Sequence, residues 1–115
     1  MFFSVNFIIR KVSMAYYYIY DGIISSGLTL SSGTYMFISS GGVANDTTVN
    51  SYGAMYISSG GTANSTTVND YGYMYISSGG VHRGSLQIES GATVSAYSGA
   101  IFDFTVADRK QKMAT

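Results

Sequence analysis

A short block of sequence repeats along this chain and decides what it can fold into. The segment Ile38–Asn50 reads ISSGGVANDTTVN, the segment Ile57–Asn69 reads ISSGGTANSTTVN, and ISSGG returns at Ile76. The isoleucines that open these copies are equally spaced and define a 19-residue repeat. A fixed period of about 20 residues is typical of solenoids, in which each repeat is one turn that buries its apolar side chains only by stacking on its neighbours.

Two weaker copies extend the repeat in both directions. Ala15–Gly33 aligns on the same period, and Gly72–Ser90 begins well but departs after Gly80. Beyond that point the match resumes one residue later, so we predict a one-residue insertion near Val81–Ser85 that forms a bulge or a longer corner. We therefore assign residues 15–107 to a repeat domain. Residues 1–14 are predicted to be a leader or N-terminal cap, and residues 108–115 a basic tail of a truncated chain.

Each repeat predicts two strands. Tyr73–Ser77 and Thr66–Asn69 are β-branched or aromatic and alternate with period two. Gly60-Gly61 and Tyr71-Gly72 provide corners between them. A unit with two short strands pairs its backbone groups by coiling over the previous turn. The sequence therefore predicts an all-β chain folded as a single-stranded parallel β-helix, a solenoid of about five 19-residue turns.

The alternation also assigns side chains to the inside and the outside. The predicted inward columns are Met36, Met55 and Met74; Ile38, Ile57 and Ile76; Val49 and Val68; and Ala44 and Ala63. The predicted outward columns are Tyr18, Phe37, Tyr56 and Tyr75; Thr48 and Thr67; and Asn50 and Asn69. Stacked aromatic rings and asparagine ladders hold repeated strands in register. These outward residues are the candidate binding face.

The charge pattern excludes several classes of function. Charged residues make up only 10% of the chain, and no Lys or Arg occurs between Val12 and His82. A nucleic-acid binder needs basic residues to neutralise phosphates, so that class is excluded. The chain has no cysteine, which rules out disulfides and Cys-ligated metals. It also lacks a run of about 20 apolar residues, so we expect no membrane span.

No catalytic or metal-binding constellation is visible. His82 is the only histidine, and we interpret it as a loop residue in a degenerate turn. Repeated acids do not stack, because Asp46 aligns with Ser65 and Asp70 aligns with Ser51. Paired carboxylates for glycoside chemistry are therefore absent, as is the GGxGxD pattern of calcium-binding β-rolls. We predict no catalytic residues, no metal, no cofactor and no enzymatic activity.

The repeat resembles a known family. The segment ISSGGTANSTTVNDYGYMYISSGG is similar to the passenger repeats of the AIDA family of autotransporter adhesins. The resemblance covers about Ala15 to Arg109 and implies a parallel β-helix at the bacterial cell surface, extracellular and part of a longer exported protein. It also implies an O-heptosyltransferase as modifying enzyme. The serines that match the family's modified positions are Ser39, Ser40, Ser58, Ser59, Ser77 and Ser78.

The residues and the resemblance together give a ranked set of functions. The first is adhesion or self-aggregation through the repetitive face, with a host-cell receptor, a glycan or copies of the chain itself as partner. The second is a structural stalk that spaces a functional head from the surface. An ice-binding or glycan-binding β-helix ranks below both, and ice binding is disfavoured because the threonine array is short.

Overall fold

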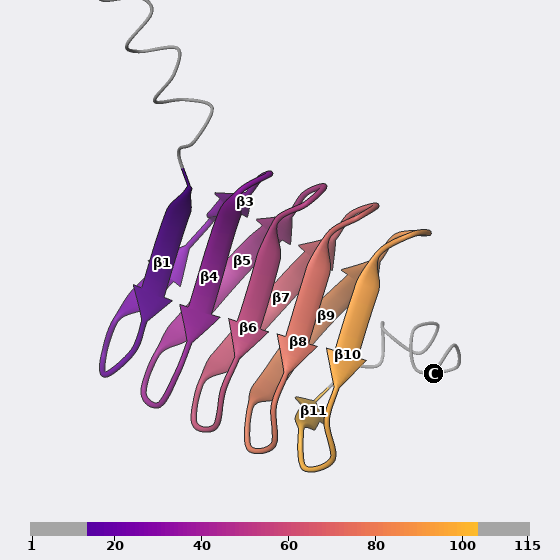
Figure 1. The fold of residues 1–115 in the computed structure, drawn as a ribbon. Helices are drawn as coiled ribbons and strands as arrows, with labels where there is room; N and C mark the ends of the chain where they lie inside the picture. Colours follow the sequence, from indigo (N-terminus) through magenta and orange to yellow (C-terminus); the bar gives the residue numbers. More distant parts are fainter. Residues whose placement is uncertain (1–13, 104–115) are drawn as a thin grey trace, which may run out of the picture.

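The computed structural model describes residues 14–103, and their regular structure consists of strands alone. The strands of successive turns lie side by side along one coil, with the two sheets on opposite sides of it (Figure 1). This confirms the predicted parallel β-solenoid of about five turns. The predicted leader or cap, apart from Met14, lies outside the described residues, and so do residues 104–107 of the repeat domain and the basic tail 108–115.

One sheet contains the strand that opens each turn. Its order is β1-β4-β6-β8-β10, and every neighbouring pair is parallel. The strands are β1 (Ala15–Ile19), β4 (Thr34–Ile38), β6 (Ala54–Ile57), β8 (Tyr73–Ile76) and β10 (Thr93–Ala96). From β1 to β8, register partners stand one full repeat apart in the sequence, as the period predicts.

The second sheet contains the return strands. Its order is β11-β9-β7-β5-β2, with β3 also paired to β5. The strands are β2 (Ile24–Ser26), β3 (Thr29–Leu30), β5 (Val43–Val49), β7 (Thr62–Val68), β9 (Val81–Ile88) and β11 (Ile101–Asp103). Among the described residues no helix is present that could cross a membrane.

The return strands are longer than the sequence predicts. We expected a strand over Thr66–Asn69, whereas β7 begins four residues earlier, at Thr62. The reason is a bend that does not interrupt the ladder. Ser65 adopts a left-handed φ of 54°, and Asp46 in the previous turn and Gly84 in the next are left-handed too. A short polar residue or glycine tolerates this conformation, so Thr62–Asn64 pair with the previous turn as well.

The predicted insertion is present. Asn64 pairs with Arg83, but Thr66 pairs with Leu86, so β9 contains one extra residue at this bend. Gly84 has a φ of 73° there. From Leu86 onward register partners are separated by one residue more than the repeat, and Val94 therefore stacks on Met74. The corner absorbs the extra residue, and the inward and outward faces are preserved.

The core is a set of continuous columns. All the predicted inward methionines, isoleucines, valines and alanines are at most 1% exposed. Leu30 begins the valine column, and Leu86 follows two inward threonines, Thr47 and Thr66. The hydroxyls of these two threonines have no hydrogen-bond partner among the described residues. The core is otherwise mostly apolar, so burial of stacked side chains is its main stabilising term.

Candidate functional site

The predicted aromatic column lies on the outer face of the first sheet. Neighbouring rings stack almost parallel, with centroids 5.5 Å apart for Tyr18–Phe37, 5.0 Å for Phe37–Tyr56 and 5.1 Å for Tyr56–Tyr75. The strand spacing of about 4.8 Å brings one ring per turn into stacking distance. The structure therefore brings these four side chains together as one continuous surface feature, which we call the aromatic column.

A second aromatic row runs beside the column and was missed by the sequence reasoning. Tyr16 and Tyr35 stack at 5.5 Å, and Tyr73 lies 6.4 Å from Tyr75. These residues precede the column residues by two, so the same alternation could have identified them. Ala54 interrupts the row at the third turn and is almost completely buried, at 3% exposure. The two rows together form a broad aromatic face on β1, β4, β6 and β8.

The aromatic face is uncharged. The strands that carry it contain no Asp, Glu, Lys or Arg. Burial raises the pKa of Tyr56 above its ordinary value, and the neighbouring Tyr75 and Tyr35 add to this rise. The Tyr56 hydroxyl is therefore neutral at physiological pH. A neutral face of this kind offers ring edges and hydroxyls to a partner without charge repulsion.

The asparagine and threonine columns are also in register. Asn69 Nδ2 donates to Asn50 Oδ1 at 2.7 Å, and a second ladder joins Asn64 Nδ2 to Asn45 Oδ1 at 2.8 Å. Thr48 pairs with Thr67, and Gln87 takes the next place in that column. The predicted threonine array therefore ends at Gln87 within the described strands. The hydrogen-bonded asparagine ladders contribute to holding the turns in register.

The predicted serine sites gather at the corner that follows the first sheet. Their backbone is fixed, because the N–H groups of Ser39, Ser58 and Ser77 each donate to an isoleucine carbonyl of the previous turn. All of these side chains are exposed or half-buried. The same backbone position in the last described turn is Tyr97. We call these six serines, Ser39, Ser40, Ser58, Ser59, Ser77 and Ser78, the serine corner.

His82 is not a loop residue, and our interpretation of it was wrong. It lies within β9, is completely buried, and takes the inward position held by Ala63 one turn earlier. Its ring is 6.4 Å from that of Phe102, which follows it in the same column. Because Val81–Arg83 continue the ladder, the alternation continues too and points this side chain inward. Its neighbour Arg83 faces out and pairs with Asp103 at 3.8 Å, with both side chains largely exposed.

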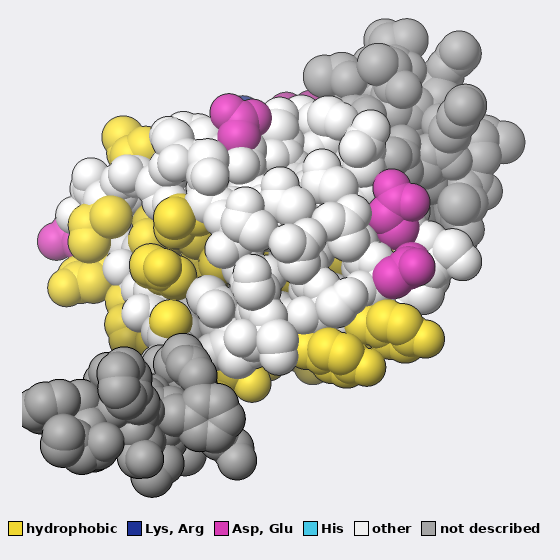
Figure 2. Space-filling view, turned by 90° about the horizontal axis from the view of Figure 1, so that it is seen from above, with side chains coloured by type: hydrophobic (Ala, Val, Ile, Leu, Met, Phe, Trp, Pro, Cys, Tyr) yellow, Lys and Arg dark blue, Asp and Glu magenta, His cyan; other side chains and the backbone are white. Residues whose placement is uncertain are grey.

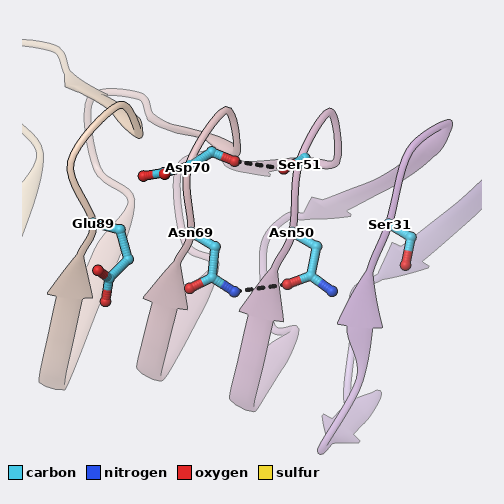
Figure 3. Close-up of a pocket in the computed structure, with 6 residues that line it drawn as sticks. All are labelled: Ser31, Asn50, Ser51, Asn69, Asp70 and Glu89. Atoms are coloured by element: carbon cyan, nitrogen blue, oxygen red, sulfur yellow. Dashed lines mark hydrogen bonds between the residues drawn. The ribbon is translucent and has the colours of Figure 1, made fainter.

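A hollow of about 580 Å³ follows the opposite corner, where β5, β7 and β9 end. It is lined by Ser31, Asn50, Ser51, Asn69, Asp70 and Glu89. Figure 3 shows one row that runs from Ser31 through the two hydrogen-bonded asparagines to Glu89. Ser51 Oγ donates to the Asp70 carbonyl at 2.8 Å and so joins adjacent turns. The hollow is open and polar, and we call it the asparagine corner.

Charge is sparse on the described surface. In Figure 2 most of the visible surface of the described residues is backbone or side chains that are neither hydrophobic nor charged, and acidic groups stand singly or in twos. Among residues 14–103 no group of three or more His, Cys, Asp or Glu side chains is placed to hold a metal ion. This surface therefore offers mainly rings, amides and hydroxyls for contact.

Comparison with known proteins identifies relatives of this architecture. A family model described as an adhesin of the bacterial autotransporter system, probable stalk, matches residues 12–72. Among solved structures, the crystal structure of a TibA fragment that is hyper-glycosylated by TibC aligns with a TM-score of 0.67 and 29% sequence identity. The alignment covers 81% of this chain and 38% of the TibA fragment. No curated protein sequence matches the chain.

Proposed function

Because this chain belongs to the AIDA family of bacterial autotransporter adhesins, we propose that it acts in adhesion or self-aggregation through its repeated aromatic face. As a passenger segment of such an adhesin it is displayed outside the cell, at the bacterial surface, as part of a longer protein. Its family is a class of adhesins and stalks rather than of enzymes. The single observation that carries the proposal is the uninterrupted aromatic column, which presents one stacked ring per turn from Tyr18 to Tyr75.

Two features of the face support contact through many weak points. Most rings of the column are only partly buried by their stacked neighbours, so their outer edges face solvent. The absence of charge from the four strands removes the repulsion that keeps similar surfaces apart. A row of similar contacts then gains affinity from each added turn, because the second and later contacts form at high effective concentration.

The aromatic column predicts the outcome of a substitution experiment. The triple variant Phe37→Thr, Tyr56→Thr and Tyr75→Thr keeps residues that favour strands but removes the stacked rings. Cells of a non-adherent strain that display this variant should settle and adhere no faster than cells that carry an empty display scaffold. Cells that display the parent chain should settle and adhere faster than both. Tyr97→Ser is the matched control, because it removes a tyrosine that is 63% exposed and lies outside the aromatic face.

A stalk is the second candidate function, and the family description favours it with the words probable stalk. A stalk needs the coil for length and needs no particular outer face. The same experiment separates the two functions. If the triple variant folds, as judged by its circular dichroism, and still aggregates and adheres like the parent, the aromatic face has no part in contact and the stalk remains.

We further propose that the serine corner accepts O-linked heptose from a dedicated transferase. The support is its exposure, and the similar TibA fragment is glycosylated by TibC. Glycines adjoin these serines: a Cβ added to Gly60 would stand 3.0 Å from Ser40 Oγ, so no side chain from that position blocks the hydroxyl. Peptide mass spectrometry after co-expression with a heptosyltransferase should show added heptose at the serine corner. Ser25, whose Oγ is buried, should stay unmodified, and equal labelling of Ser25 would contradict the proposal.

A further inference from the structure

Two tyrosines at the asparagine corner occupy backbone positions that favour glycine. Tyr52 has a φ of 67° and Tyr71 a φ of 64°. The same position in the flanking turns is Gly33, with a φ of 81°, and Gly91, with a φ of 97°. A bulky residue in this left-handed region is strained, so corner geometry alone does not explain the tyrosines.

Backbone hydrogen bonds show that these four residues form one column. Gly33 N–H donates to Tyr52 O at 3.4 Å, Tyr52 N–H to Tyr71 O at 2.7 Å, and Tyr71 N–H to Gly91 O at 3.1 Å. The order along the coil is therefore glycine, tyrosine, tyrosine, glycine. The two tyrosine rings stack at 5.7 Å with an angle of 10° between their planes, and the side chains are 55% and 56% exposed.

In this order each tyrosine ring stacks on the other tyrosine on one side, and on its other side its neighbour in the column is a glycine. The next position beyond Tyr71 is Gly91, and glycine has no side chain to cover the ring. The space over Gly91 is bordered by an acid: Asp70 Oδ1 lies 3.4 Å from the point where a Cβ would stand on that glycine. Asp70 directly precedes Tyr71, so both residues flank the same gap.

The hollow of the asparagine corner shares Asp70 with this gap. Glu89 also lines the hollow and precedes Gly91 by two residues in the sequence. In Figure 3 its carboxylate is next in the row after Asn69. Asn69 uses its Nδ2 to bond Asn50, which leaves its Oδ1 as an acceptor. The gap over Gly91 therefore combines one flat aromatic face with the Asp70 carboxylate. Glu89 and Asn69 line the hollow that shares Asp70 with it and offer further acceptors there.

From this arrangement we propose that the gap over Gly91, beside Tyr71, binds a neutral pyranose ring of a glycan. The C–H face of a pyranose packs against the negative face of an aromatic ring, and its hydroxyls donate to carboxylate and amide oxygens, which are acceptors. Two carboxylates without a Lys or Arg in the lining of the hollow disfavour uronic and sialic acids. Tyr71 and Gly91 lie at a corner and are not residues of the aromatic face, so this proposal is tested independently of the proposed self-aggregation.

The test is saturation-transfer NMR on the full 115-residue chain. The probes are the methyl pyranosides of glucose, galactose and mannose, with N-acetylneuraminate as the anionic comparison. At least one neutral pyranoside should receive saturation, and N-acetylneuraminate should not. Tyr71→Gly introduces glycine, the residue that the flanking turns have at this position. It should weaken binding by about tenfold or more, since it removes the stacking ring. Tyr97→Ala, which removes an exposed tyrosine elsewhere, should leave binding unchanged.

A second variant keeps the tyrosine and closes the gap. Gly91→Asn introduces a residue that tolerates positive φ, and its side chain should occupy the space and cause a similar loss of binding. The proposal is overturned if none of the three neutral pyranosides receives saturation, or if both variants bind like the parent. Aggregation that depends on the aromatic column would persist in either case, which separates this failure from that of the proposed function.

Discussion

Gly61→Ala should lower the free energy of unfolding by about 3 kcal/mol, as overpacking of a close-packed site does. A Cβ on Gly61 would stand 2.6 Å from the Ile38 carbonyl oxygen and 2.8 Å from its carbonyl carbon. Ile38 cannot move away easily, because that same oxygen accepts a 2.7 Å hydrogen bond from Ser58 N–H. Denaturant unfolding followed by circular dichroism measures the loss.

The neighbouring turns supply graded controls for this prediction. At Gly80 the nearest atom to an added Cβ is the Ile57 oxygen at 2.9 Å, so Gly80→Ala should cost less than Gly61→Ala. Ser59→Ala, at an exposed position of the same corner, should change stability by no more than about 0.5 kcal/mol. Equal effects at Gly61 and Ser59 would show that the inner corner has room for a side chain.

The repeat made most of the fold predictable, because a constant period fixes which side chains stack. Once Ile38, Ile57 and Ile76 are aligned, the inward position of Met55 follows from the two-residue alternation. The insertion was predictable for the same reason, since a change of register is visible wherever the columns resume. Local sequence carried little of this information. The arrangement comes from the long-range pairing of each turn with the next.

Positions where local and periodic signals conflict were not predicted. The bend at Ser65 lies inside a ladder and has no glycine or proline to mark it, so β7 was predicted too short. His82 was interpreted from its irregular surroundings, whereas its place in the Ala63 column puts it inside. Tyr35 and Tyr73 were missed because Ala54 interrupts their row. The left-handed backbone of Tyr52 and Tyr71 was not predicted, because a tyrosine rarely occupies this region.

Deletion of one whole period should leave a folded chain, whereas deletion of one residue fewer should not. Removing Ile57–Tyr75 takes out one complete repeat and joins Tyr56 to Ile76, so every later side chain keeps its face. His82 then stacks on Ala44 instead of Ala63, and the two alanines leave it the same space. Because contacts are confined to adjacent turns, the shortened coil should unfold cooperatively and be shorter by about 4.8 Å.

Removing only Ile57–Met74 shifts the rest of the chain by one position. Tyr75 then occupies the inward place of Ile57, and Ile76 turns outward. A one-residue slip moves the whole apolar set of a strand to the solvent face, so this variant should aggregate or lack a cooperative unfolding transition. Circular dichroism and small-angle scattering on the two deletions provide the comparison. Similar behaviour of the two chains would mean that the columns do not determine the fold, because only the alternation of inward and outward residues distinguishes them.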